Sequence, residues 1–291
     1  MRVWGTVGWI VVGIGIGQWL LYRHTPIEVS ADVVRLAQVR GMGDAFRVSA
    51  ILGFVLGIFC FLLPKTPPAR GTQPFAPLEA LGEVKRNPLL ILFIISFPIA
   101  CVHQFYFVHT AGFLGDLQRA GGAGLANSIN RIFGVGGGGL MTIGQISEIF
   151  VLAVIPFFAK RVSRKTFLAI GLLAYILRFL VFAYLQHPWA VIPALALHGL
   201  CFGCFFFIAF MIVDENTTPD VRASAQGLFN LVIVGLGVIL GNYFAGEIAQ
   251  RASVVGGGID YRTLFAIPMW ICVGCLALLL IAYPGGRAVA E

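Results

Sequence analysis

The stretch MTIGQISEIFVLAVIPFFAKRVSRKTFLAIGLLAYILRFLVFAYLQ (141–186) decides the fold class of this chain. It consists of two apolar runs, 141–159 and 166–186, on either side of the charged turn 160–165. Each run is long enough to cross the hydrocarbon core of a bilayer as a helix, which takes about 17–25 residues. Two such runs joined by a short polar turn are typical of two antiparallel transmembrane helices.

Apolar runs of similar length lie on both sides of this pair, and they cover 3–22, 47–64, 88–109, 190–213, 223–246 and 263–284. The composition agrees with this pattern, because 58% of the 291 residues are hydrophobic and only 11% are charged. An average soluble domain has about 25% charged residues. The sequence therefore predicts an all-α integral membrane protein with about eight transmembrane helices, in the inner or plasma membrane.

The turn 160–165 also predicts the orientation. It contains four Lys or Arg residues and no acid, and such turns face the cytoplasm. Counting spans outward from this turn predicts that both termini are cytoplasmic. The formal net charge of +7 then belongs to short loops between helices, so we expect a lipid bilayer and no nucleic acid as a partner.

The segment 65–87 combines several prolines with mixed charge, which is typical of a polar linker. It predicts three parts: two helices in 1–64, a cytoplasmic linker over 65–87, and six helices in 88–291.

Two patterns of soluble proteins occur in this chain, and both have a simpler interpretation. A G-x-G-x-x-G motif (Gly134, Gly136, Gly139) opens a predicted span instead of following a strand, so the glycine-rich stretch 110–140 is interpreted as an external loop. Two C-x-x-C pairs lie inside apolar runs, where cysteine packs as a small hydrophobe. We expect no metal and no cofactor.

Ionisable residues inside a membrane span are costly and indicate function. Glu148, Arg178 and His198 each lie seven or eight residues from the external end of their predicted helices, so a rise of 1.5 Å per residue places all three about 10–12 Å deep. Gln145 shares a helix face with Glu148. A carboxylate beside a permanent cation can ionise at this depth, which favours a proton relay or a polar substrate site. A static buried ion pair, or an Arg178 side chain that reaches the headgroups, is the structural alternative.

Four stretches, RVWGTVGWI (2–10), GQISEIFVLAVIPFFAKR (144–161), LRFLVFAY (177–184) and VDENTTPDVRASAQGLFN (213–230), resemble the nucleoside:proton symporters of the major facilitator superfamily. That superfamily has twelve helices in two halves. The resemblance implies that this chain corresponds to helices five to twelve, in a major-facilitator-type helical bundle, and is N-terminally incomplete.

The resemblance also implies a substrate site. The family pattern carries over to positions on helices five, seven and eight, namely Arg2, Thr6, Trp9, Gln104, Gln145 and Glu148. Proton coupling is expected from Glu148, Arg178 and His198. The chain departs from the family pattern at Phe107, where a polar residue is usual, and at Gly203, where an acid is expected.

The leading hypothesis is a proton-coupled nucleoside transporter that works by alternating access, with a nucleoside or similar small polar solute and protons as its partners. A sugar or oligosaccharide:proton symporter is the first alternative, because His198 in its Leu-His-Gly context resembles the coupling histidine of those proteins. A truncated, non-transporting remnant is the second. A membrane prenyltransferase would need paired acidic clusters, and only Asp214, Glu215 and Asp220 approach one, so we expect no enzyme.

Overall fold

The computed structural model describes residues 2–65, 81–120, 123–254 and 257–284. Within these residues, 8 helices are long and apolar enough to cross a membrane. The predicted all-α membrane fold is therefore confirmed. Most of the predicted linker, residues 66–80, lies outside the described residues.

The helices are α1 (Arg2–Arg23), α2 (Ala31–Cys60), α4 (Leu89–Ala120), α5 (Ala123–Phe133), α6 (Gly138–Phe158), α7 (Arg164–Tyr184), α8 (Pro188–Leu200), α9 (Ile208–Glu215), α10 (Arg222–Asn230), α11 (Gly237–Arg251) and α12 (Tyr261–Ala282). A π-helical segment, η1 (Cys201–Phe207), joins α8 to α9, and a second one, η2 (Leu231–Leu236), joins α10 to α11. Two short antiparallel strands, β1 (Ser253–Val254) and β2 (Gly258–Ile259), form a hairpin before α12.

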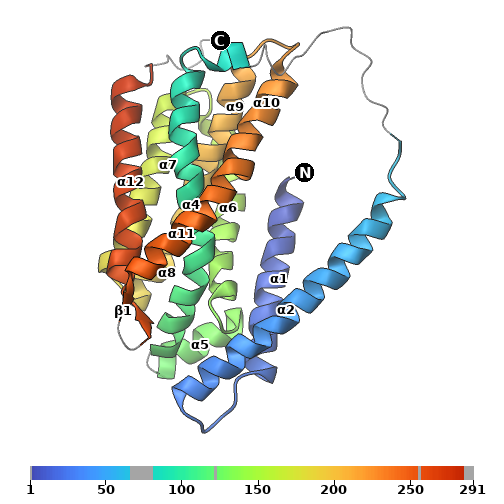
Figure 1. The fold of residues 1–291 in the computed structure, drawn as a ribbon, viewed down its shortest axis with the longest axis vertical. Helices are drawn as coiled ribbons and strands as arrows, with labels where there is room; N and C mark the ends of the chain where they lie inside the picture. Colours follow the sequence, from blue (N-terminus) through green and yellow to red (C-terminus); the bar gives the residue numbers. More distant parts are fainter. Residues whose placement is uncertain (1, 66–80, 121–122, 255–256, 285–291) are drawn as a thin grey trace.

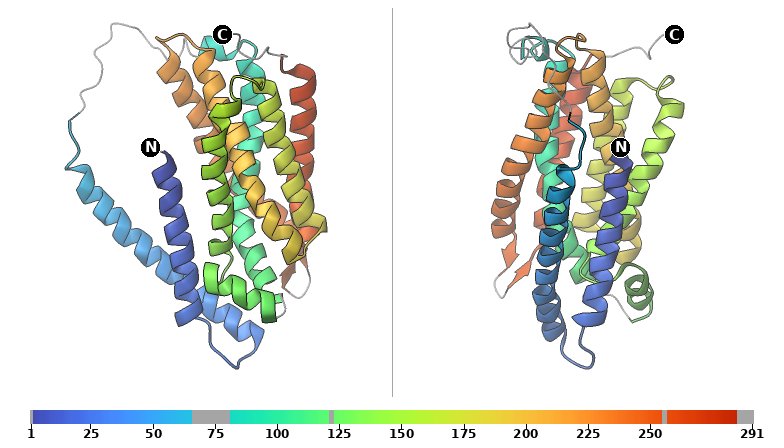
Figure 2. Two further views of the ribbon diagram at one scale, coloured as in Figure 1. Left: turned by 180° about the vertical axis from the view of Figure 1, so that it is seen from behind. Right: turned by 90° about the vertical axis from the view of Figure 1, so that its right-hand side faces the viewer.

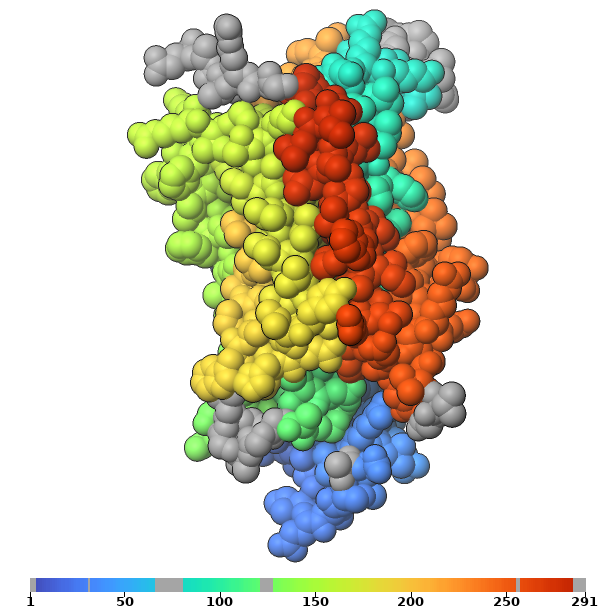
Figure 3. Space-filling model, turned by 90° about the vertical axis from the view of Figure 1, so that its left-hand side faces the viewer, coloured from blue at the N-terminus to red at the C-terminus, as the bar shows by residue number. Residues whose placement is uncertain are grey.

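Helices α4 and α6–α12 form the packed bundle (Figure 1). Helix α12 packs against α7 and α4 along one face (Figure 3), α6 packs against α8, and α11 packs against α4. Aromatic side chains fill the centre of the bundle, and the largest buried ones include Phe113, Phe179, Phe182 and Phe265. At one end, Arg164 on α7 holds Glu215 on α9 through two contacts of 3.1 and 2.7 Å.

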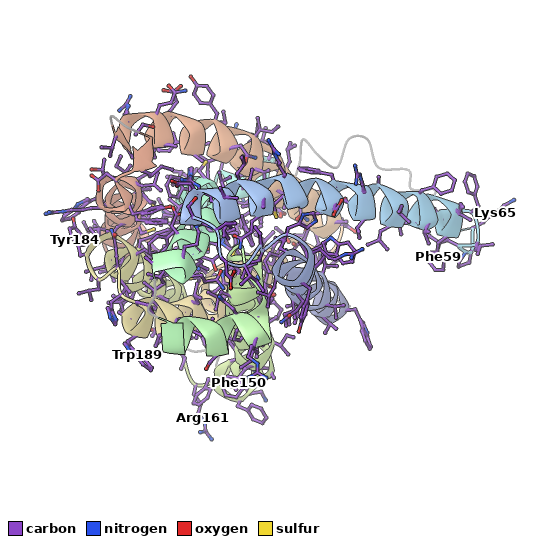
Figure 4. All side chains as sticks on the ribbon, turned by 90° about the horizontal axis from the view of Figure 1, so that it is seen from below. Phe59, Lys65, Phe150, Arg161, Tyr184 and Trp189 are labelled. Carbon is purple, nitrogen blue, oxygen red and sulfur yellow. The ribbon has the colours of Figure 1, made fainter. Side chains whose placement is uncertain are left out.

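Helices α1 and α2 form a hairpin beside this bundle. Helix α1 packs against α6 and α5, whereas α2 leans away from the bundle towards its C-terminal end (Figures 1 and 2). Phe59 and Lys65 mark that distant end (Figure 4). None of the most apolar part of α2 is buried inside the protein.

Two boundaries differ from the sequence prediction. The stretch 110–140 is mostly helical, because α4 continues to Ala120 and α5 follows it, so the interpretation of this stretch as a loop is wrong. Phe113 and Leu114 are fully buried, and their packing stabilises the helix despite the neighbouring glycines. The turn is confined to residues 134–137, where three glycines have positive φ. Helix α2 also starts at Ala31 rather than at residue 47, because a helix extends beyond its apolar part.

Candidate substrate and proton site

The acid of the site comes from α6. Glu148 and Gln145 lie one helical turn apart on this helix, and each residue is only 6% exposed. Glu148 is the only buried carboxylate among the described residues. Both side chains face the imidazole of His198 on α8. The distance from Gln145 Nε2 to His198 Nε2 is 3.2 Å, and the distance from Glu148 Oε2 to the same nitrogen is 3.7 Å.

The other nitrogen of His198 faces Arg178 on α7. Arg178 Nη1 lies 3.0 Å from His198 Nδ1. A guanidinium is always a donor, so Nδ1 accepts, and the hydrogen of the neutral ring is on Nε2. The Nε2–H group therefore points towards Glu148 and towards the carboxamide of Gln145. Exchange of the nitrogen and oxygen of that carboxamide, which have nearly the same shape, lets its oxygen accept this hydrogen.

Arg178 is fully buried, so it does not reach the headgroup region. Its guanidinium carbon lies 3.9 Å from the centre of the Tyr106 ring and 5.0 Å from that of Tyr175. These ring faces attract the cation, which offsets part of the cost of burying its charge. His198 lies between this charge and Glu148, with one ring nitrogen towards each group.

Two rings on α4 enclose His198. Tyr106 stacks on one face of the imidazole with ring centroids 5.1 Å apart, and His103 stacks on it at 5.4 Å. His103 also bonds to the hydroxyl of Tyr175, with Nδ1 and the oxygen 2.6 Å apart. Sequence reasoning did not assign these three residues to the site. Their spacing gave a signal, because His103 and Tyr106, like Tyr175 and Arg178, are three residues apart on one helix.

Helix α1 contributes to the same site. The hydroxyl of Thr6 donates to Glu148 Oε1 over 3.2 Å. Trp9, one turn further along, meets Phe107 edge-on with centroids 6.2 Å apart. Arg2 begins α1, but its side chain lies outside what the structure describes.

Gln104 lies elsewhere. Its amide donates to Asn242 on α11 over 3.1 Å, so it borders α11 instead of the His198 cluster.

The structure also shows the surroundings of the two residues that depart from the family pattern, Phe107 and Gly203. Phe107 lies against His198, with ring centroids 5.9 Å apart. Gly203 packs so closely on α6 that an added Cβ would lie 2.7 Å from Val151, which leaves no room there for an acid.

Small residues bring α6 and α8 into close contact. A Cβ added at Gly144 would lie 2.8 Å from Cβ of His198, and one added at Gly199 would collide with Ser147. Such small-residue contacts are typical of packed membrane helices. They fix the distance between the backbone of His198 and the helix that carries Glu148. The π-helical segment η1 starts three residues after His198, and π segments are frequent at functional sites.

This arrangement suits reversible protonation. An ionised Glu148 accepts from Thr6, faces the Nε2–H of His198 and balances the buried charge of Arg178. A protonated Glu148 loses its charge and changes from acceptor to donor at one oxygen. One proton therefore changes both the charge of the site and its bond to α1.

A model of the family described as "Nucleoside H+ symporter" matches residues 1–285. The chain belongs to this family. Members of the Nucleoside H+ symporter family are membrane transporters, which agrees with the prediction that the chain is not an enzyme.

Similar proteins carry related names. The chain is 28% identical to the "Putative nucleoside transporter YegT" of Escherichia coli (strain K12), over 97% of this chain and 62% of that protein. It is 28% identical to the "Nucleoside permease NupG" of the same organism, over 92% of this chain and 60% of that protein. The chain thus spans about six tenths of the length of these relatives. A crystal structure of the nucleoside transporter NupG has the same fold, with a TM-score of 0.70, 25% identity, and coverage of 98% of this chain and 67% of that one.

Proposed function

We propose that this chain takes part in proton-coupled nucleoside transport by alternating access, with Glu148 as the group that binds the proton. The observation that carries the proposal is the position of this carboxylate. It is bonded to Thr6 on α1, faces His198 on α8, and lies on the far side of His198 from Arg178. The family and the names of the relatives support a nucleoside as the substrate.

The substrate groups are proposed to lie around this acid. An ionised carboxylate accepts hydrogen bonds from ribose hydroxyls, and the carboxamide of Gln145 pairs with polar edges of a base. The exposed edge of Trp9 offers an apolar surface to the same space. Arg2 and Gln104 are proposed as more distant contacts. The positively charged turn 160–165 supports a cytoplasmic position for both termini.

The experiment is uptake of tritiated nucleoside into cells that carry the full-length gene, driven by an inward proton gradient. We expect accumulation that a protonophore collapses and that Glu148→Gln abolishes, because the amide keeps the size of the side chain but does not ionise. Glu28→Gln is the matched control, since Glu28 is an exposed loop carboxylate. Accumulation by Glu148→Gln with unchanged pH dependence would reject Glu148 as the proton carrier.

One observation favours the non-transporting alternative, namely that the most apolar part of α2 has no buried residue. Nucleoside binding without accumulation in liposomes that contain only the 291-residue chain would support it, and saturable uptake there would rule it out. A panel of competing nucleosides, monosaccharides and oligosaccharides tests the sugar alternative, because a sugar symporter is inhibited by the sugars and not by the nucleosides.

A further inference from the structure

A separate cavity, lined by both polar and apolar residues, lies at the end of the bundle that carries α5. It has a volume of about 600 Å³ and lies between the α1–α2 hairpin and helices α4 and α5. None of the residues of the Glu148 cluster lines it. Its polar lining comes from four segments of the chain, and it consists of Thr25, Gln38, Gln118, Arg119, Asn130 and Arg131.

Hydrogen bonds hold this lining in place. Gln38 on α2 is only 5% exposed; it donates to Thr25 Oγ1 over 3.2 Å and accepts from Arg119 Nη1 over 3.3 Å. Gln118 on α4 donates to Asn130 Oδ1 over 2.9 Å, and its own oxygen accepts from the backbone N–H of Gly137. The cavity is therefore formed by ordered polar groups from both the hairpin and the bundle.

The cavity lining carries positive charge, and its side chains offer more hydrogen-bond donors than free acceptors. It contains two arginines and no acid. Asp116, beside the cavity, forms an ion pair with Arg119 and also accepts from the hydroxyl of Tyr261, so it offsets one of the two charges. The guanidinium of Arg131 is the second charge. The oxygen of Asn130 is engaged by Gln118, which directs the remaining hydrogen-bonding capacity of this amide to donation.

The same lining contains no aromatic ring on which a nucleobase stacks. Guanidinium and amide donors that line one cavity match an anion with several acceptor oxygens, and a phosphate group has that chemistry. We propose that this cavity binds a phosphate group, taken from the headgroup of an anionic lipid or from a soluble phosphate ester. Bound there, the phosphate bridges Gln38 of the hairpin to Arg119 and Arg131 of the bundle.

The position of α5 at the end of the bundle favours lipid headgroups as a source of the phosphate. This helix of 11 residues crosses the end of the bundle (Figure 2), at the level where the spans begin and end. Short helices in that position lie in the headgroup layer, with basic residues towards the lipid phosphates. Arg131 is exposed on α5 and also lines the cavity.

The test uses the purified 291-residue chain in nanodiscs of phosphatidylcholine, with and without phosphatidylglycerol. Lipid retention is measured by native mass spectrometry and the melting temperature by intrinsic fluorescence. We expect phosphatidylglycerol to be retained and to raise the melting temperature, and Arg131→Gln to weaken its binding about tenfold. Arg131→Lys should retain most of the effect, because it keeps the charge. Arg251→Gln, at an exposed arginine that does not line the cavity, is the matched control.

A second arm separates the two sources of phosphate. Inorganic phosphate and glycerol 3-phosphate are titrated into nanodiscs of phosphatidylcholine alone. Stabilisation by these soluble ions that depends on Arg131 assigns the site to a soluble phosphate ester, and stabilisation by phosphatidylglycerol alone assigns it to a lipid. Equal responses of wild type and Arg131→Gln in both arms, or no response in either, overturn the proposal. None of these readouts depends on transport, so they are independent of the proposed function.

Discussion

The hydroxyl of Thr6 on α1 donates to Oε1 of Glu148 on α6 over 3.2 Å, across 142 positions of the chain. The proposed proton acceptor is thus bonded to the hairpin as well as to the bundle. A hydrogen bond to an ionised group is stronger than one to a neutral group, so protonation of Glu148 weakens this link between α1 and α6.

The first prediction concerns this link. Thr6→Val keeps the shape of the side chain and removes the donor, and we expect a coupling free energy of about 1 kcal/mol with Glu148→Gln in a double-mutant cycle. The cycle is measured on nucleoside affinity at a pH at which Glu148 is ionised. Thr6→Ser, which keeps the hydroxyl, should behave as wild type. Strictly additive effects of Thr6→Val and Glu148→Gln would show that the bond has no energetic role.

The second prediction concerns the tautomer of His198. Because Arg178 donates to Nδ1, the ring hydrogen should be on Nε2, and ¹⁵N spectra of histidine-labelled protein should show that single form. Arg178→Gln should yield a mixture of tautomers and a defect in nucleoside accumulation similar to that of Glu148→Gln. His187, an exposed imidazole at the start of α8, serves as the internal reference and should not change. An Nδ1–H form in the wild type would contradict the proposed arrangement of the site.

The third prediction concerns the contact of α6 with α8. Gly144→Ala places a methyl group 2.8 Å from Cβ of His198, so α8 must move away from Glu148. We expect a loss of about 1–3 kcal/mol in the free energy of unfolding and weaker nucleoside binding. Gly138→Ala on the same helix has open space around the new Cβ and should change neither quantity. If the two variants behave alike, the close contact does not hold the site together.

The fourth prediction concerns orientation. In a variant without the native cysteines, Arg161→Cys should be shielded from an impermeant thiol reagent in intact cells, and Ser128→Cys should be labelled. Both positions are exposed, and they lie in the 160–165 turn and on α5 respectively. Arg161 is preferred to Ser163, because the side chain of Ser163 caps the N-terminus of α7. The reverse labelling pattern would place both termini outside.

The membrane fold was predictable, because long apolar runs leave the backbone few alternatives to a spanning helix. Helix ends were less predictable. Residues 110–120 contain glycine and charge but are helical, since Phe113 and Leu114 are buried against other helices, and this packing involves residues distant in the sequence.

For the candidate site, the sequence predicted which residues lie at one depth but not which of them are in contact. The depth of Glu148, Arg178 and His198 was estimated from helix rise alone, and the structure places the three side chains in one cluster. The order of the contacts was not predictable, because it depends on which helix faces which. His198 therefore emerges as the central residue. His103 joins the cluster from α4, a helix that the depth argument did not link to it, and Tyr175 joins from α7, one turn before Arg178.

The π-helical segment η1 has a mechanical consequence. Before it, α8 is held against α6 by Gly144 and Gly199, and after it, α9 is held by the contacts of Glu215 with Arg164. Beside it, η1 packs closely on the backbone of Gly171 on α7, where an added Cβ would lie 2.8 Å from Phe205. A π-helical turn is wound more loosely than an α-helical turn, so a twist between the two fixed ends of this span deforms η1 first. We therefore expect a rotation of α8 relative to α9 to be concentrated within a few residues of His198.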